Sequence, residues 1–219
     1  MRLMMTVMRF VFHLLYHEFA WSYDLVAGVV SLGRWKGWVL SSLPHLEGRM
    51  FEIGYGPGHL QEALQAEGRA AFGLDVSPQM AHQASRRLGR KGFPVNLVRG
   101  VAQHLPFQAN AFETIVATFP SEYIYEAQTL AEARRVLVPK GRLVILPMAW
   151  ITGGGILDRL AAWLFRVTGQ AGAIESVLPA IRKRLQSAGF AMRHELVEMR
   201  GSWVLVILAE KNTSVEKTC

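Results

Sequence analysis

The stretch "FEIGYGPGHL", residues 51–60, places three glycines at every second position: Gly54, Gly56 and Gly58. An acid, Glu52, lies two residues before the first glycine, and apolar residues lead into the motif. Glycine is used where the chain turns through positive φ or where a ligand approaches the main chain closely. A glycine-rich turn from a strand into a helix also points free N–H groups at an anionic group. The motif therefore predicts a strand, a ligand-holding turn and a helix, in that order.

The pattern around this motif alternates between apolar strands and amphipathic helices. Strands separated by helices of this length predict a parallel sheet with right-handed crossovers. Two strands near the end are joined by little more than Gly201, so they form a hairpin and bring an antiparallel strand into the sheet. The expected strands are 49–53, 70–76, 93–100, 112–119, 142–150, 190–200 and 202–211, and the expected helices are 59–68, 77–92, 126–138 and 175–189.

Two regions fall outside this alternation. Residues 1–48 predict two helices, which we interpret as an N-terminal helical cap or lid. Residues 151–170 predict a glycine hinge followed by an amphipathic helix, inserted into a core domain that spans 49–219. Both regions adjoin strands whose carboxyl ends should form the ligand crevice of an open α/β sheet.

Composition indicates one reduced, cytoplasmic domain. About half of the 219 residues are hydrophobic (51%), which is enough to bury a sizeable core. Lys and Arg outnumber Asp and Glu by 24 to 17, giving a net charge of +7, and the excess is spread over expected helix surfaces. We interpret it as a solvated face, with weak attraction to an anionic membrane or to nucleic acid as the alternative. The single cysteine, Cys219, excludes a disulfide framework and a cysteine-ligated metal.

The N-terminal segment is apolar but interrupted by charges. Arg2, Arg9 and Glu18 break it into runs far shorter than the roughly 20 residues of a membrane span. It also lacks the order of regions that defines a signal peptide. We therefore expect a cytoplasmic protein, with peripheral contact at the inner membrane face as an extension of this prediction.

Three ligands compete for the glycine turn. A P-loop is excluded because no Gly-Lys-Ser/Thr follows at the required spacing. A dinucleotide fingerprint, G-x-G-x-x-G, is weakened because His59 stands where the third glycine belongs. The third pattern, acid-x-G-x-G-x-G, fits, and Asp75 follows Gly56 by 19 residues, at the spacing of a ribose-binding acid. Glu52 would repel a pyrophosphate but suits an ammonium group, so S-adenosylmethionine is the ligand that fits.

Further motifs strengthen this interpretation. In order along the chain, "FEIGYGPG", "GLDVSPQM", "RGVAQHLPF", "FETIVATF" and "ARRVLVPKGRLVIL" resemble the successive motifs of class I S-adenosylmethionine-dependent methyltransferases. They most resemble the branch of quinone-biosynthesis C-methyltransferases and related small-molecule methyltransferases, over roughly residues 49–148. The resemblance implies a Rossmann-like, seven-stranded, mostly parallel sheet with an antiparallel last strand and helices on both faces. It also implies S-adenosylmethionine as cofactor and S-adenosylhomocysteine as product.

The resemblance assigns roles to individual residues. It implies that the glycine turn lines the methionine part of the cofactor, that Asp75 holds the ribose and that Val76 and Met80 flank the adenine. One departure is Val101, which stands where the family usually has an acid and cannot accept from the adenine amino group; the loss is about 1 kcal/mol unless another acceptor replaces it. The cofactor residues implied are Glu52, Gly54, Tyr55, Gly56, Gly58, Asp75, Val76, Met80, Ala102, Gln103 and Phe119.

The acceptor side is less defined by sequence. The loop "TFPSEYIYE", residues 118–126, offers Glu122 and Tyr123 as candidate catalytic groups. His13 and His17 are four residues apart, but no third ligand is evident, so no metal site is predicted. Aromatic residues outside the core are candidates for a substrate pocket, namely Tyr16, Trp21, Tyr23 and Trp163.

These observations favour a methyltransferase for a hydrophobic small molecule, lipid-like or quinone-like, methylated on oxygen or carbon. Nucleic acid is disfavoured as a partner, and the oligomeric state stays open. Three alternatives remain at this point: an RNA methyltransferase with a continuous basic surface beside its pocket, a nicotinamide-dependent oxidoreductase, and a non-catalytic binder of the cofactor.

Overall fold

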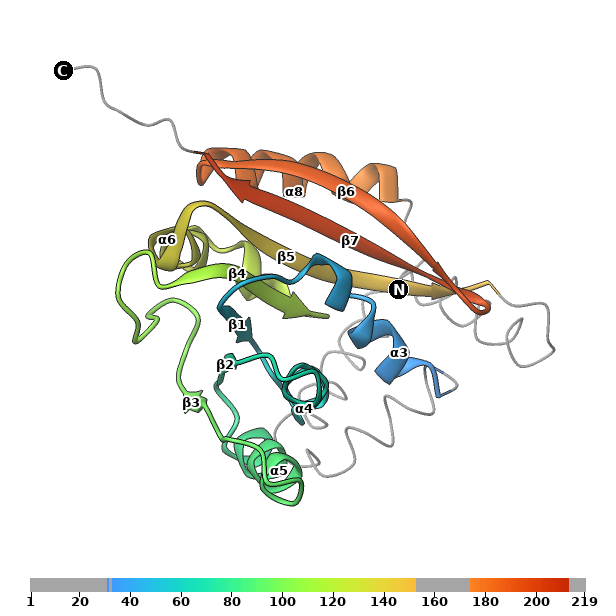
Figure 1. The fold of residues 1–219 in the computed structure, drawn as a ribbon. Coiled ribbons are helices and arrows are strands. Elements are labelled where there is room, and N and C mark those ends of the chain that lie inside the picture. The colour runs from blue at the N-terminus through green and yellow to red at the C-terminus, as the bar shows by residue number, and fades with distance from the viewer. Residues whose placement is uncertain (1–30, 32, 153–173, 213–219) are drawn as a thin grey trace, which may run out of the picture.

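A seven-stranded sheet forms the centre of the protein in the computed structural model, which describes residue 31 and residues 33–152 and 174–212 (Figure 1). The strand order is β3-β2-β1-β4-β5-β7-β6. The bounds are β1 Met50–Ile53, β2 Ala71–Asp75, β3 Leu97–Arg99, β4 Phe112–Thr118, β5 Leu137–Ile151, β6 Phe190–Met199 and β7 Ser202–Lys211.

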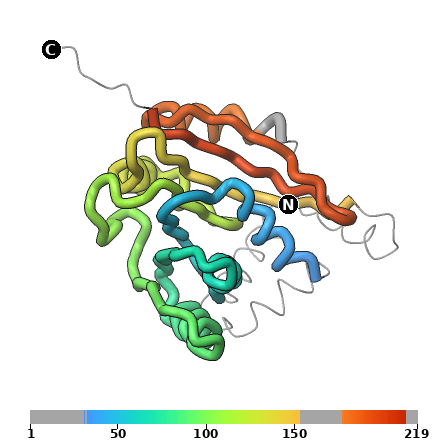
Figure 2. Tube along the Cα trace, in the orientation of Figure 1, coloured from blue at the N-terminus to red at the C-terminus, as the bar shows by residue number. Residues whose placement is uncertain are grey.

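The pairing confirms the predicted mostly parallel sheet. Strands β1, β2, β3, β4 and β5 pair in parallel, whereas β7 is antiparallel to both neighbours, β5 and β6. Figure 2 shows the β6–β7 hairpin running alongside β5. The strand order reverses between β1 and β4, because the chain builds outward from β1 to β3 and then crosses to the other side. Open α/β sheets bind ligands at the carboxyl ends of strands flanking such a reversal.

Helices cover both faces of the sheet, as predicted. Helices α3 (Trp35–Leu40) and α4 (His59–Ala66) contribute to one apolar cluster, and α6 (Ala127–Val136) and α8 (Ile174–Ser187) to the other. Alternate residues of the strands point into the two clusters, as the pleat requires; in β1, Met50 belongs to the first and Phe51 to the second. Helix α5 (Pro78–Gly89) packs against α4, β2 and β3, and two 3₁₀ helices, η2 (Leu43–His45) and η3 (Glu122–Tyr125), complete the described elements.

Local sequence explains why these elements begin and end where they do. Ser77 caps α5, accepting from the Met80 N–H at 3.3 Å, and Pro78 occupies the first turn. Strand β5 begins directly after α6, earlier than predicted, because residues 138–141 form an irregularity opposite β4 that accommodates Pro139. Strand β3 is shorter than predicted, and Pro94, which cannot donate to a ladder, lies before it.

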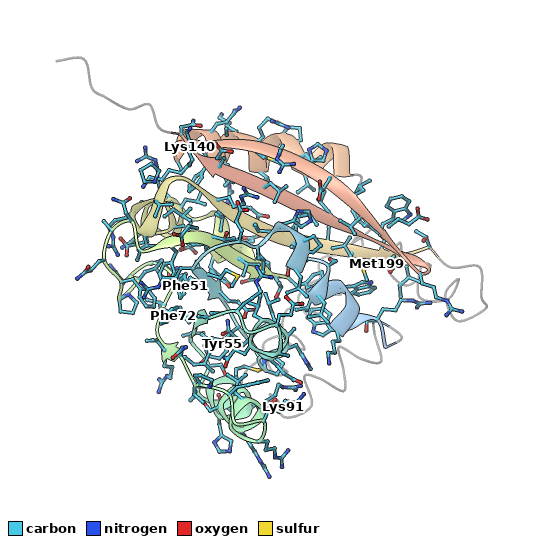
Figure 3. The ribbon with its side chains drawn as sticks, in the orientation of Figure 1. Phe51, Tyr55, Phe72, Lys91, Lys140 and Met199 are labelled. Atoms are coloured by element: carbon cyan, nitrogen blue, oxygen red, sulfur yellow. The ribbon has the colours of Figure 1, made fainter. Side chains whose placement is uncertain are left out.

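Aromatic side chains pack densely near the amino ends of β1, β2 and β4. Phe51 stacks on Phe112 with ring centroids 5.1 Å apart, and Phe107 meets both rings edge-on. Figure 3 shows the buried Phe51 with the half-buried Phe72 nearby, and Lys91 and Lys140 at the periphery. This cluster fixes β1, β2 and β4 relative to one another, so the turns that follow these strands have a rigid base.

Several predictions fall outside the described residues. They concern the first helix of the predicted cap, the insertion predicted at 151–170 apart from its first two residues, and the pocket candidates Tyr16, Trp21, Tyr23 and Trp163. Within the part of the chain that the structure describes, no helix has both the length and the apolar character needed to cross a bilayer.

Candidate active site

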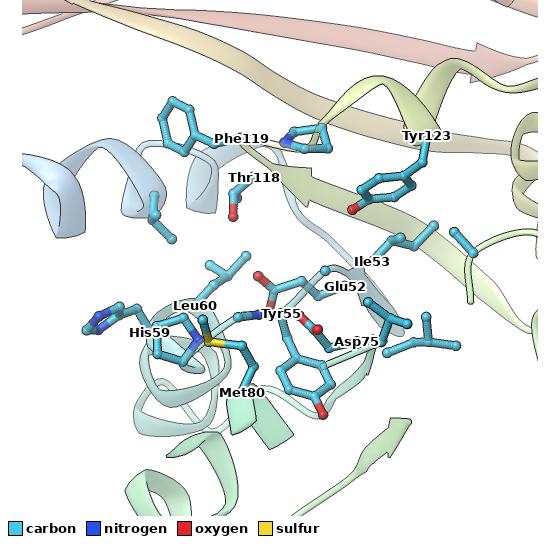
Figure 4. Close-up of a pocket in the computed structure, with 18 of the residues that line it drawn as sticks. Glu52, Ile53, Tyr55, His59, Leu60, Asp75, Met80, Thr118, Phe119 and Tyr123 are labelled. Atoms are coloured by element: carbon cyan, nitrogen blue, oxygen red, sulfur yellow. Dashed lines mark hydrogen bonds between the residues drawn. The ribbon is translucent and has the colours of Figure 1, made fainter. Parts of the chain in front are cut away.

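A cavity of about 270 Å³ opens at the carboxyl ends of β1, β2 and β4 (Figure 4). It is the place where the topology reverses, as the sequence predicted. Most of the predicted cofactor residues line it, namely Glu52, Gly54, Tyr55, Gly56, Asp75, Val76, Met80, Ala102, Gln103 and Phe119. The structure thus brings together residues that lie up to 67 positions apart in the chain.

The glycine turn forms the floor of this cavity. Gly54 and Gly56 both have positive φ, 77° and 51°, which side-chain-bearing residues rarely adopt. An ideal Cβ on Gly56 would meet no atom within 4 Å and would project into open space. A ligand can therefore approach the backbone here, which fits the elongated S-adenosylmethionine molecule.

Gly58 has a different role from the one predicted. It also has positive φ, 82°, but it begins α4 and does not line the cavity. An ideal Cβ at Gly58 would lie 2.9 Å from the Ala84 Cβ. The structure therefore gives no support to the prediction that Gly58 lines the methionine end; the residue allows α4 and α5 to approach each other closely.

Glu52 is a buried acid at the centre of the cavity, with only 2% of its surface exposed. The Gln61 side-chain amide donates to its Oε2 at 2.8 Å. Burial raises the pKa of Glu52 to about 8, with Asp75 adding to the rise and the Gln61 hydrogen bond opposing it. A buried carboxyl with so high a pKa is stabilised as the anion by a cation, which is what the ammonium group of S-adenosylmethionine supplies.

Asp75 links the ends of two strands. Its Oδ2 accepts from the Gly56 N–H and its Oδ1 from the Ser77 N–H, each at 2.9 Å. Burial raises the pKa of Asp75, and these backbone hydrogen bonds oppose the rise. An ionised carboxylate has about four acceptor positions, so two remain for a pair of hydroxyl groups. Asp75 therefore shapes the glycine turn and can still hold a ribose.

The wall beyond Asp75 is apolar. Val76 and Val101 line the cavity while being unusually exposed for valine, 59% and 43%. Two apolar side chains at one rim suit the faces of a flat ring. Gln103 also lines this end, and its amide nitrogen donates to Glu126 at 2.6 Å, which leaves the amide oxygen as an acceptor near Val101.

Tyr55 packs beneath the turn instead of pointing across the cavity. Its ring lies against Gly73 of β2, where an ideal Cβ would come within 2.8 Å of the Tyr55 Cδ1. Burial raises the pKa of Tyr55 to about 12, and the nearby acids Asp75 and Glu52 add to the rise. The phenol therefore stays neutral and supports the glycine turn from below.

An aromatic wall faces the other end, and the sequence had indicated only one of its two residues, Phe119, and not Trp35. Trp35 of α3 packs on Phe119 with ring centroids 4.6 Å apart, and both line the cavity. Phe119 has a φ of 50°, a strained conformation for an aromatic residue, held where β4 ends. The signal was present in "GRWKGWVL", a short aromatic helix just before the first strand, but the prediction placed the aromatic wall earlier, at 16–23.

The two catalytic candidates differ in position. Tyr123 lines the cavity, and its hydroxyl lies 2.6 Å from the point where a Cβ on Gly54 would be. Glu122 is exposed and is not among the lining residues. This placement gives no support to Glu122 as a general base, since a base must reach the proton that it removes.

His59 also lines the cavity, and the sequence interpretation did not include it. The Arg87 guanidinium lies 3.0 Å from its Nδ1. A guanidinium can only donate, so Nδ1 accepts and the neutral ring carries its proton on Nε2. No cluster of metal-ligating side chains occurs among the described residues.

The fold and this cavity together are those of a class I S-adenosylmethionine-dependent methyltransferase. A family model described as "Methyltransferase domain" matches residues 51–145. Demethylmenaquinone methyltransferase of Deinococcus radiodurans is 30% identical over 213 residues, covering 83% of this chain and 86% of that protein. The corresponding enzyme of Thermus thermophilus is 29% identical, covering 84% and 94%. The chain therefore belongs to the family of S-adenosylmethionine-dependent methyltransferases that contains these quinone-biosynthesis C-methyltransferases.

Solved structures agree with this fold. A methyltransferase from Aquifex aeolicus superimposes with a TM-score of 0.55 at 19% identity, covering 80% of this chain and 88% of that one. The [4+2]-cyclase SpnF superimposes with a TM-score of 0.58 at 17% identity, covering 82% and 81%. Likenesses at such identity concern the fold alone, so the reaction must be argued from the site.

Proposed function

We propose that this methyltransferase acts on a hydrophobic, quinone-like small molecule and methylates a ring carbon or a phenolic oxygen. The observation that carries the proposal is the Trp35–Phe119 wall, which shares one cavity with the acid-flanked glycine turn. Flat apolar rings stack well on such a wall. The names of the relatives support the same acceptor class, since both act, by name, on demethylmenaquinone.

The residues of the chain divide the work of binding. Glu52 pairs with the ammonium group of the cofactor, Asp75 with the ribose, and Val76 and Val101 with the faces of the adenine. S-adenosylmethionine, when bound, supplies an electrophilic methyl group on a sulfonium sulfur. In the overall reaction the acceptor gains that methyl group and loses a proton, and S-adenosylhomocysteine is released.

The acceptor side of the cavity contributes to the reaction mainly by aligning the acceptor with the methyl group. Trp35 and Phe119 hold the acceptor ring in line with the methyl group. Tyr123 places a hydroxyl next to Gly54 of the cofactor turn. That hydroxyl can position an acceptor oxygen, while the proton is lost from an already acidic hydroquinone. No role for Glu122 enters this proposal.

Product analysis tests the proposal directly. The protein is incubated with S-adenosylmethionine and a reduced, short-chain demethylnaphthoquinone, and the lipid extract is analysed by mass spectrometry. We expect a product heavier by the mass of one methylene, with less from the oxidised quinone. Methylation of total RNA without any quinol product would show that the acceptor class is wrong. Tight binding of S-adenosylhomocysteine with no product on any quinol would indicate a non-catalytic binder.

A matched pair of variants tests the acceptor side. Tyr123→Phe removes the hydroxyl over Gly54, and we expect kcat to fall about tenfold or more if that hydroxyl positions the acceptor. Glu122→Gln changes the exposed neighbouring residue and should leave kcat within about twofold. An equal loss in both variants would indicate that the whole loop is disturbed, and no loss in either would remove Tyr123 from the proposed alignment.

A further inference from the structure

A second hollow lies between α6 and α8, on the sheet face opposite α3 and α4. Its volume is about 880 Å³. The two helices cover the sheet side by side in the same apolar cluster, with Leu130 of α6 and Ile181 of α8 both buried there. The cofactor cavity shares none of the residues that line this hollow.

Cations dominate the walls of this hollow. Arg134 of α6 and Lys183 and Arg184 of α8 line it, and within the described residues their side chains make no hydrogen bond or ion pair. The acid among the lining residues is Glu126, which accepts from Gln103 at 2.6 Å. Three cations around one hollow with a single, already engaged acid create a local excess of positive charge.

Two buried polar atoms in this hollow lack partners among the described residues. They are the Tyr125 hydroxyl oxygen and the Arg134 Nε, and each has almost no contact with solvent. Such atoms are rare in native proteins and call for a partner. Burial raises the pKa of Tyr125, although Arg184 opposes the rise, so the phenol remains a hydrogen-bond donor. The hollow therefore offers donors: a hydroxyl, two guanidinium groups and an ammonium group.

The Arg134 side chain owes its position to a glycine in the neighbouring turn. Its side chain passes over Gly189 in the turn from α8 to β6, where an ideal Cβ would lie 2.7 Å from the Arg134 Nε. Gly189 also has a φ of +82°, which favours glycine on its own. A single glycine thus ends the helix and leaves room for the guanidinium that faces the hollow.

We propose that the hollow between α6 and α8 binds a phosphoryl group through Arg134, Arg184, Lys183 and the Tyr125 hydroxyl. A phosphate has several acceptor oxygens and negative charge, and guanidinium groups recognise it with paired, charge-assisted hydrogen bonds. Two sources share this chemistry: free phosphate and the headgroup of an anionic lipid. The inference does not depend on the acceptor proposed above, because the two sites share no lining residue.

Two binding assays distinguish the sources. Inorganic phosphate is titrated into the protein by calorimetry, and the melting temperature is followed in parallel, since a ligand of the native state raises it. Flotation is measured with vesicles of phosphatidylcholine alone and with roughly one third phosphatidylglycerol. Phosphate binding supports the free ion, and binding to anionic vesicles without phosphate binding supports the headgroup. Binding in neither assay overturns the proposal.

Variants separate a built site from general charge. Arg134→Gln with Arg184→Gln should weaken binding about tenfold or more in whichever assay is positive. The control is Arg86→Gln with Arg90→Gln, which removes the same charge from two exposed positions, one in the last turn of α5 and one at its C-cap. Equal weakening in both pairs would overturn the proposal, because net charge alone would then explain the binding.

Tyr125→Phe is a second test of the site, for the case in which the arginine variants fail to fold. It removes a buried hydroxyl that lacks a protein partner among the described residues, so the melting temperature without ligand should not fall. Binding should nevertheless weaken several-fold, because one donor is lost. Unchanged binding in Tyr125→Phe together with unchanged binding in the arginine pair would reject the site.

Discussion

The two ends of the main cavity recognise their ligands by different means. At one end the backbone of Gly54 and Gly56 is bare and two buried acids, Glu52 and Asp75, lie beside it. At the other end Trp35 and Phe119 form a wall of rings contributed by elements that are remote in sequence. The first end binds charged and hydroxyl groups at fixed positions, whereas the second provides an apolar surface for stacking. A cofactor of constant structure suits the first, and an apolar acceptor suits the second.

The largest expected effect on cofactor affinity comes from adding a side chain to the glycine turn. Gly56→Val places a side chain in the open space of the cavity, and we expect affinity for S-adenosylhomocysteine, measured by calorimetry, to fall about 100-fold, on the order of 3 kcal/mol. Gly68→Val is the matched control, because Gly68 also has positive φ and open space around it but lies at the end of α4. Both changes should cost a similar 1–2 kcal/mol, roughly, of stability through backbone strain. Equal affinity of the two variants for S-adenosylhomocysteine would mean that the glycine turn does not bind the cofactor.

The next effect concerns the ribose. Asp75→Asn keeps the shape but removes the charge, and affinity for S-adenosylhomocysteine should fall by about 2 kcal/mol, since hydroxyl groups lose a charged acceptor. The melting temperature should also fall, because Asp75 accepts from the Gly56 and Ser77 N–H groups.

A ligand without the 2′ and 3′ hydroxyls separates these two roles of Asp75. The wild type should bind this analogue more weakly than S-adenosylhomocysteine, whereas Asp75→Asn should hardly distinguish them. If the variant still discriminates as strongly as the wild type, the ribose is held elsewhere.

The buried Glu52 at the cofactor end should make the stability of the protein depend on pH. Its pKa rises from the ordinary value of 4.5 to about 8 in the folded protein, so the folded state holds more protons than the unfolded chain between these values. The free energy of unfolding should therefore fall as pH rises through this window, by about 2 kcal/mol between pH 6 and 8. Melting curves across this range test it, and Glu52→Gln should flatten the dependence. A wild-type curve as flat as that of the variant would mean that Glu52 is ionised without ligand.

The smallest effect is expected at the aromatic wall. Trp35→Leu should raise KM for a quinol acceptor about tenfold, because a large stacking surface is lost, and leave affinity for S-adenosylhomocysteine nearly unchanged. Trp38→Phe is the control: Trp38 is buried, and its Nε1 donates to the Ser202 hydroxyl at 2.9 Å, so its loss should lower the melting temperature without raising KM. A fall in cofactor affinity as large as the rise in KM would show that the two ends are not separate.

Sequence predicted the first end much better than the second. The glycine turn and Asp75 are local features whose spacing is set by one strand–turn–helix unit and its neighbouring strand, so their meeting follows from the topology. Trp35 reaches Phe119 only because α3 packs across the end of β4, and no spacing in the chain encodes that packing. His59 was missed for a similar reason, since Arg87, which fixes its tautomer, comes from the next helix.

Two predicted site residues gain no support from the structure, for physical reasons that the sequence pattern could not show. Gly58 shares its spacing with the two lining glycines, but it faces Ala84 of the neighbouring helix instead of the cavity. Glu122 and Tyr123 are adjacent, and the 3₁₀ turn that contains both places only one of them in the cavity. Side-chain direction within a short turn depends on the whole environment and is not readable from residue order.

The position of β7 has a consequence for how the chain reaches its native state. This strand, residues 202–211, lies between β5 and β6 although it follows both in sequence. During synthesis, which proceeds from the N-terminus, the 15-residue β5 keeps one edge uncovered until Ser202 and the residues after it have emerged. An unpaired edge of this length is a template for pairing with other chains. The interval between the synthesis of β5 and that of β7 is therefore when this edge is most exposed to pairing with other chains.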